Sequence, residues 1–308
     1  MLFARLRHRL KEDEKIYDET IQQAIAEEER LKSKKPQWGW GEDKLIDLPE
    51  GRILLSTEES VLLDPVLSRA RCSEAAPDLF EDQAACRIAR YFDRDISSEL
   101  PDVEDYLEAF KQYHFIKMAK VYLELFPRAY AIDLGCGLST LRQQLDNKTL
   151  KWINIDTEAN LGARGKLGLD RKERSKNIAC DPFGYDWVRE VQYKQDRGCV
   201  FFLEAPLISR SAHAAKQLLS VIKDCFPGAF VMFSCQTRRV ASGSTNFQLY
   251  TINAQDVFHS WFDDPSVRVY SKVLPPKDEL SLCTPKSIKR PLKRAFKQGS
   301  QILVDIRF

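Results

Sequence analysis

The sequence of 308 residues lacks the features that mark several common classes of protein. Its eight cysteines include no C-x-x-C pair, and its four histidines form no cluster with zinc spacing, so we predict neither disulfides nor a metal site. No apolar stretch approaches the roughly 18 residues needed to span a bilayer. The formal net charge is only +2, so no global field favours nucleic acid or an anionic membrane.

The first residues also lack a continuous apolar core and a small-residue cleavage site, so we do not expect a secretory signal. Residues 1–33 contain no glycine and no proline, and their spaced apolar residues predict one or two amphipathic helices. The cysteines lie mostly in apolar runs, which indicates buried free thiols and a cytoplasmic protein.

The stretch KKPQWGWGEDK breaks the helical pattern and contains Trp38 and Trp40. These rings either pin a loop onto the core or belong to a mobile lid over a pocket. Helical patterns follow at 57–93, with a break at Pro77, and at 103–126. We therefore expect an N-terminal helical cover over residues 1–100 and a second domain over residues 101–308.

From residue 129 onward, short apolar runs alternate with helical segments. We expect strands at 129–136, 151–156, 176–181, 199–206, 228–235, 267–274 and 300–308. The alternation predicts a parallel sheet whose strands are buried by helices on both faces, and the last two strands favour an antiparallel hairpin. The predicted fold class is α/β, a doubly wound seven-stranded and mostly parallel sheet of the Rossmann-like type.

The stretch AIDLGCGLSTLRQQL carries Gly135 and Gly137 between the first strand and a helix. Glycines at such a position allow a ligand to come very close to the backbone. Four successive strands also end in a carboxylate, from Asp133, Asp156, Asp181 and Glu204. Because ligands of doubly wound sheets bind at the carboxyl ends of the strands, these residues are candidates for one site.

The carboxylates favour a cationic nucleoside over a dinucleotide. The turn GCGLST lacks the third glycine of G-x-G-x-x-G, and a pyrophosphate would meet several negative charges. S-adenosylmethionine fits better: Asp156 would accept both ribose hydroxyls, Asp181 the adenine amino group, and the Gly135–Gly137 turn would admit the methionine portion. The alternative is that the aspartates only cap helices or brace the loop.

These segments resemble the leucine carboxyl methyltransferase family of class I S-adenosylmethionine-dependent enzymes, which includes bacterial polyketide O-methyltransferases. DLGCGLSTLRQQL resembles its glycine turn, with Ser139-Thr140 and Arg142 where the family has Asp-Thr and an arginine. RARCSEAAPDLFEDQAA resembles its upstream Arg-Ala and Asp-rich segment, and FFLEAPLI resembles its Glu-Gly-Val-Leu strand. The resemblance covers roughly residues 57–235.

The resemblance implies how the cofactor's amino-acid end is bound. Arg69 and a basic residue of the helix before the first strand would hold its carboxylate. Lys111 matches by spacing, with His114 as the alternative. Glu204 would lie by the ammonium or the sulfonium.

The acceptor side departs from the family, because Ala205 to Arg210 replace the segment that carries the family's tyrosine. A carboxylate acceptor needs a cation rather than a general base, and no histidine stands in a base-plus-orienter motif. Arg210, Arg238 and Arg239 are therefore the acceptor-side candidates.

We expect an O-methyltransferase acting on a carboxylate or hydroxyl of a small molecule. The alternatives are a non-catalytic S-adenosylmethionine-binding protein and a carboxyl methyltransferase for a protein C-terminus.

Overall fold

The computed structural model describes residues 46, 48–51, 53–77, 80–94, 96, 100–170, 174–203, 211–237, 248–249, 254–263, 265–270, 290 and 301–308. All of these residues belong to the compact unit Gly39–Phe308. The predictions for residues 1–33 and for the tryptophan loop lie outside the described residues.

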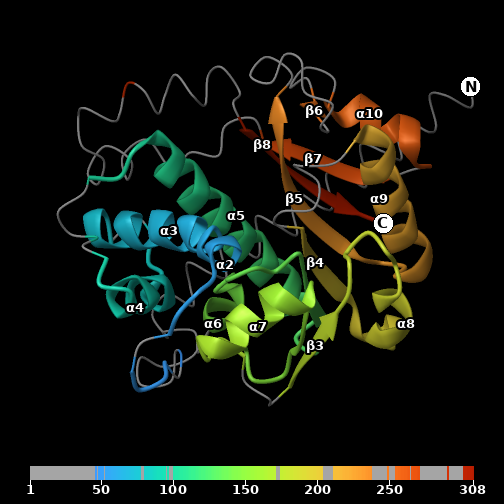
Figure 1. Cartoon of the computed structure of the whole chain (residues 1–308). Coiled ribbons are helices and arrows are strands. Elements are labelled where there is room, and N and C mark those ends of the chain that lie inside the picture. The colour runs from blue at the N-terminus through green and yellow to red at the C-terminus, as the bar shows by residue number, and fades with distance from the viewer. Residues whose placement is uncertain are drawn as a thin grey trace, which may run out of the picture. The chain divides into compact units, whose positions relative to one another are not determined.

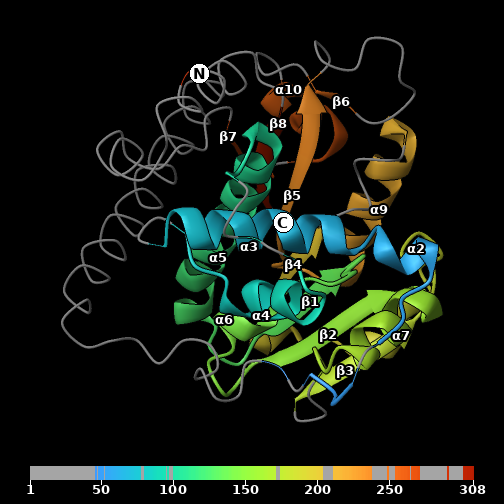
Figure 2. The same ribbon diagram turned by 60° about the vertical axis from the view of Figure 1, so that its left-hand side comes forward.

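A mixed sheet forms the centre of this unit, in the order β3-β2-β1-β4-β5-β8-β7, with β6 paired to β5 (Figures 1 and 2). Its strands are β1 (Tyr130–Leu134), β2 (Lys151–Asp156), β3 (Ser175–Ala179), β4 (Cys199–Leu203), β5 (Phe230–Thr237), β6 (Gln248–Leu249), β7 (Ser266–Tyr270) and β8 (Gln301–Arg307). In the described part of the chain, β8 is antiparallel to β5 and β7, and the other pairs are parallel. This confirms the predicted doubly wound, mostly parallel sheet with an antiparallel finish, and adds the two-residue β6.

The strand order places a switch point beside β1. The chain runs outward from β1 to β2 and β3, and then crosses back to β4 on the other side of β1. In such sheets a crevice opens where the order reverses, at the carboxyl ends of the strands. The glycine turn follows β1 directly and therefore lies at this crevice.

The helices are α2 (Thr57–Ser60), α3 (Leu63–Ala75), α4 (Gln83–Tyr91), α5 (Val103–Leu125), α6 (Leu141–Leu145), α7 (Glu158–Lys166), α8 (Trp187–Val191), α9 (Ala212–Cys225) and α10 (Ala254–Trp261). A short 3-10 helix spans Gln195–Arg197. Local capping starts several of them, as at α5, where Asp102 and Asp105 form a capping box. The helical prediction at 57–93 is confirmed as three helices, and the chain leaves helix between α3 and α4, around Pro77.

The two faces of the sheet differ in polarity. One face packs apolar side chains such as Phe201 against Trp187 of α8 and Phe226, in a core that also includes α9 and α10. The opposite face carries four polar side chains that are each at most 1% exposed, namely Asp133, Asn154, Ser234 and Asp305. This second face lies against α5, whose Phe115 contacts Phe202 of β4. Asp133, which is discussed with the candidate site below, belongs to this polar face.

The prediction that the strands are buried on both faces is wrong for β3. Lys176, Asn177 and Ala179 of this strand are exposed, and only Ile178 is buried. The reason is its position at the edge of the sheet, where β2 is its only strand partner among the described residues.

Helices α3 and α4 pack together and reach the sheet domain. Val66 and Ala70 of α3 share an apolar cluster with Ile88 of α4 and Ala163 of α7, and Figure 2 shows α3 crossing over α5. The division into a cover over 1–100 and a domain over 101–308 stays a prediction. None of the helices in the described ranges is long and apolar enough to cross a membrane.

Candidate functional site

The turn after β1 has the backbone shape that its glycines predict. Gly135 and Gly137 have φ values of +71° and +41°, in the left-handed region that favours glycine. The amide of Gly135 donates to the carbonyl of Ile155 in β2, at 2.8 Å, which ties the start of the turn to the neighbouring strand. The turn is therefore a fixed feature at the switch point.

Asp156, the last residue of β2, is bonded to this turn. Its Oδ2 accepts from the amide of Gly137 at 2.8 Å. Its Oδ1 accepts from the amide of Thr157 at 2.7 Å and from Asn160 Nδ2 at 2.8 Å. A carboxylate offers about four lone-pair sites, so Oδ2 retains capacity for a further donor. The side chain is only 5% exposed.

Asp133 lies deeper than the sequence suggests. It is inside β1, in register with Asn154 of β2 and Phe202 of β4, and is 1% exposed. Asp133 therefore contributes negative charge beneath the turn and does not stand at the rim of the sheet.

Asp181 differs from Asp156 in its exposure. It lies two residues beyond the end of β3 and is exposed to solvent. Its Oδ1 accepts from the amide of Phe183 at 3.0 Å, which shapes a local turn. The next residue inward, Cys180, donates its amide to the carbonyl of Asp156 at 2.9 Å, so the two strand ends are linked.

The other candidates named from the sequence at this rim are Glu204, Arg210, Arg238 and Arg239. They lie outside the described residues, and their roles stay predictions.

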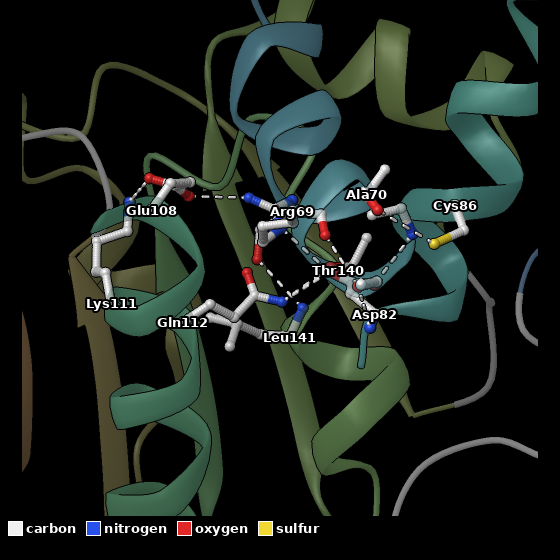
Figure 3. Close-up of polar contacts among 12 residues, drawn as sticks. Arg69, Ala70, Asp82, Cys86, Glu108, Lys111, Gln112, Thr140 and Leu141 are labelled. Carbon is white, nitrogen blue, oxygen red and sulfur yellow. Dashed lines mark hydrogen bonds and ion pairs between the residues drawn. The ribbon is translucent and has the colours of Figure 1, made fainter. Parts of the chain in front are cut away.

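Arg69 of α3 and Lys111 of α5 are brought together by a carboxylate that the sequence did not single out. Glu108 Oε1 accepts from Arg69 Nη1 at 3.0 Å, and its Oε2 lies 2.7 Å from Lys111 Nζ (Figure 3). Although burial acts in the opposite direction, the cations of Lys111 and Arg69 lower the pKa of the Glu108 carboxyl. Glu108 is therefore ionised at neutral pH.

Asp82 connects this cluster to the glycine turn. It is fully buried, and its Oδ2 accepts from Arg69 Nε at 3.1 Å and from Thr140 Oγ1 at 2.6 Å (Figure 3). Gln112 Nε2 donates to both Asp82 and Thr140, at 3.0 and 3.1 Å. Thr140 immediately precedes α6, three residues after Gly137. Two hydrogen bonds thus separate the Arg69 guanidinium from the helix that follows the turn.

Arg164 of α7 binds the backbone carbonyls of the same turn. Its Nη1 donates to the carbonyls of Gly137 and Ser139, at 3.0 and 2.9 Å, and its Nε donates to Asp170 at 3.1 Å. The side chain is fully buried. One feature of the sequence could have indicated that Arg164 is buried. It follows Leu161 by one helical turn and therefore lies on the apolar face of its helix.

Cys136 sits between the two glycines but is not a nucleophile. It is 2% exposed, and burial raises the pKa of its thiol well above the ordinary value, with a further contribution from Asp133. A neutral buried thiol behaves as a small apolar side chain. The described cysteines, which are Cys72, Cys86, Cys136, Cys180, Cys199, Cys225 and Cys235, are free.

His114, the alternative to Lys111, points elsewhere. Its Nε2 lies 3.1 Å from Oδ1 of Asp305 in β8, 191 residues away in the chain. The sequence shows no base-plus-orienter motif for this histidine, and its carboxylate neighbour comes from a distant part of the chain. Both side chains are buried, at 5% and 1% exposure, so the pair joins α5 to the sheet.

No protein-family model and no curated protein matches this chain. Among solved structures, a candidate methyltransferase from Thermobifida fusca YX is 12% identical over 80% of this chain and 96% of its own, with a TM-score of 0.49. The plantazolicin methyltransferase BpumL, in complex with SAH, is 11% identical over 82% and 99%, with a TM-score of 0.41. A duf574 family protein from Streptomyces avermitilis is 8% identical over 78% and 96%, with a TM-score of 0.48. At TM-scores below 0.5 these likenesses assign no function.

Proposed function

We propose that this chain is an S-adenosylmethionine-dependent O-methyltransferase that acts on a carboxylate or hydroxyl of a small molecule. The observation that carries the proposal is the 2.8 Å hydrogen bond from the Gly137 amide to Asp156. A turn that binds phosphate presents its amides to the ligand. Here one of these amides is bonded to a carboxylate, and that carboxylate lies where a ribose would meet the switch point.

The local charge supports a cationic nucleoside in preference to a dinucleotide. Asp156 lies against the turn, Asp133 lies beneath it, and Asp181 follows the next strand. A pyrophosphate would be repelled by these carboxylates, whereas a sulfonium would be stabilised.

Three parts of the site would hold the cofactor. Asp156 Oδ2 would accept from the ribose, and Asp181 would accept from the adenine amino group. The bare backbone of Gly135 and Gly137 leaves space for the chain that leads to the sulfur. The bound cofactor would supply an activated methyl group on its sulfonium.

Methyl transfer of this kind demands little chemistry from the protein. Holding two reactants in line is worth about 7–11 kcal/mol, and a carboxylate acceptor is already ionised near neutral pH. Arg210, Arg238 and Arg239 are proposed to hold the acceptor, and Glu204 to lie near the sulfonium. The finer assignment to the leucine carboxyl methyltransferase family rests on the sequence resemblance. A cytoplasmic location fits the free thiols.

Calorimetric titration of the full chain with S-adenosylmethionine, S-adenosylhomocysteine and NAD tests the proposal. We expect binding of the first two and not of NAD. Asp156→Ala should weaken S-adenosylmethionine binding by about 1.5–3 kcal/mol, because charge-assisted hydrogen bonds are lost.

Asp146→Ala is the matched control, since Asp146 is buried and pairs with Arg174 at the C-terminal end of α6. It should lower stability without changing ligand affinity. Binding of NAD alone, or unchanged affinity in a folded Asp156→Ala variant, would contradict the proposal. Transfer of a labelled methyl group to a panel of small carboxylic acids and phenols then separates catalysis from binding.

A further inference from the structure

The junction between α2 and α3 lies against the glycine turn. Leu62, which precedes α3, has its Cδ2 atom 3.7 Å from the position that a methyl group on Gly137 would take. At this separation two carbon atoms are in van der Waals contact. Leu62 therefore occupies the space directly beside Gly137, and a ligand that lies against the turn on this side meets the Leu62 side chain.

Helix α2, on the other side of this junction, has few contacts with the rest of the chain. None of its residues, Thr57–Ser60, is buried, and Val61, which follows it, is 64% exposed. Ser56 and Glu59 form a capping box, which serves the backbone of α2 itself. Segments with few buried apolar contacts open at a low cost in free energy. α2 can therefore move while the helices around it stay folded.

The chain is fixed on both sides of this mobile element. The amide of Ile53 donates to the hydroxyl of Tyr91 in α4, at 3.0 Å. Leu63, the first residue of α3, is buried in the apolar cluster that α3 shares with α4 and α7. Residues 54–62 thus form a strap between two fixed points, and Leu62 is the residue of the strap that touches the glycine turn.

One ion pair fastens the strap to α7. Glu59 Oε1 lies 2.6 Å from Lys166 Nζ, and α2 lies beside α7 in both views (Figures 1 and 2). Within the described part of the chain, no other side-chain hydrogen bond or ion pair joins α2 to another element. The hydrogen bond from Lys166 lowers the pKa of the Glu59 carboxyl, so the pair is ionised at neutral pH. Lys166 is 43% exposed, which makes the pair sensitive to salt.

We propose that Leu62 is a further residue of the cofactor site, a wall that moves with α2, and that the Glu59–Lys166 ion pair latches this wall over the bound ligand. This proposal rests on the proposed function. Opening of the latch lifts Leu62 from the turn, so that the cofactor enters and its demethylated product leaves. Closing brings an apolar side chain against the ligand and excludes water from its sulfur.

A latch and a fixed brace predict different binding kinetics. The ion pair holds the strap closed both with and without ligand. Weakening it therefore raises the open fraction in both states, which speeds entry and exit together and leaves the equilibrium affinity nearly unchanged. A brace that only shapes the site would instead change the affinity, mainly through the dissociation rate.

The first test measures the association and dissociation rates of S-adenosylhomocysteine by stopped-flow fluorescence of the full chain. Lys166→Gln removes the ion pair and leaves the capping box, which uses Oε2 of Glu59. We expect both rates to rise about two- to fivefold, the Kd to change by less than about twofold, and the difference from the unaltered chain to vanish near about 1 M salt.

Lys176→Gln is the matched control for Lys166→Gln. Lys176 of β3 also forms an exposed ion pair, with Glu190 of α8 at 2.9 Å, but this pair does not involve the strap. The control should change neither rate. Unchanged rates in Lys166→Gln, or a rise in its dissociation rate alone, would overturn the latch.

The second test is Leu62→Ala, with the neighbouring Val61→Ala as its control. Leu62→Ala should raise the dissociation rate of S-adenosylhomocysteine about 5- to 20-fold, because the ligand loses an apolar contact when the wall closes. Val61 is exposed, so Val61→Ala should change the rate by less than about twofold. Equal dissociation rates in the two variants would show that Leu62 is not part of the site.

A third measurement needs no ligand and separates the latch from the proposed function. The amides of Ser60 and Leu62 are hydrogen-bonded within the strap, and their hydrogen exchange reports how often it opens. Exchange should be about two- to fivefold faster in Lys166→Gln than in Lys176→Gln. If no adenosine ligand binds the unaltered chain, the proposed function fails, and the role of Leu62 in the site with it. Equal exchange in the two lysine variants overturns the latch on its own.

Discussion

At the scale of single residues, the turn after β1 depends on backbone shape more than on space for a side chain. Gly135 and Gly137 have positive φ values, whereas the nearest described atom to a methyl group at Gly137 would be Leu62 Cδ2, at 3.7 Å. That separation is an ordinary van der Waals contact. With respect to the neighbouring protein atoms, the requirement for glycine at this position is therefore conformational, and the space that the proposed cofactor would need is a separate requirement.

Two substitutions at Gly137 separate the conformational requirement from a steric one. Gly137→Ala should lower the free energy of unfolding by about 1–2 kcal/mol, because an L-residue resists the left-handed region. Gly137→Asn should cost less, although its side chain is larger, since asparagine adopts this conformation more readily. Urea denaturation of both variants measures the difference. A larger loss for asparagine than for alanine would show that side-chain space is limiting.

At the scale of elements, α7 is joined to the glycine turn by Arg164. One guanidinium donates to two carbonyls of the turn and to Asp170, all in a buried setting. The planar fork of arginine allows these bonds to form together. The position of the turn is therefore determined by the helix after β2 as well as by the strands.

Arg164→Lys should lower the free energy of unfolding by about 2–4 kcal/mol, because one ammonium cannot serve every acceptor and buried carbonyls lose their donor. Arg174→Lys is a suitable comparison. Arg174 also pairs with a carboxylate, on Asp146, but is 33% exposed and should lose less than about 1 kcal/mol. Denaturation curves of the two variants that coincide would contradict the support role of Arg164.

At the scale of the whole described unit, α5 binds to the last strand of the sheet. His114 and Asp305 meet on the face that also carries Asp133 and Asn154. The helix that supplies Glu108 and Lys111 is thereby held against β8, which lies between β5 and β7. A contact at the far end of the sequence thus helps to fix a helix of the candidate site.

A double-mutant cycle tests this contact. His114→Leu should lower stability by about 3 kcal/mol, since it leaves the Asp305 carboxylate buried without its partner. Replacing both, with His114→Leu and Asp305→Val, should cost less than the sum of the two single changes. Additivity within about 0.5 kcal/mol, measured by denaturation, would mean that the two side chains are not coupled.

Much of the fold could be predicted from the sequence, because its signals are local. Apolar runs near 130, 151 and 199 alternate with helical segments, and that rhythm alone indicates parallel β-α units. The exposure of β3 could not be predicted in this way. A strand becomes an edge through the order in which strands pair, and that order is a property of the whole sheet.

The sequence by itself determined the parts of the candidate site that follow from local chemistry: the Gly135–Gly137 turn and an aspartate, Asp156, at the end of the next strand. Only the tertiary structure decided which groups face one another. Arg69 meets Glu108 across 39 residues, Arg164 meets Gly137 across 27, and His114 meets Asp305 across 191. Such contacts leave no periodic trace in the chain, because they depend on how helices pack over the sheet, and packing is set by all the elements together.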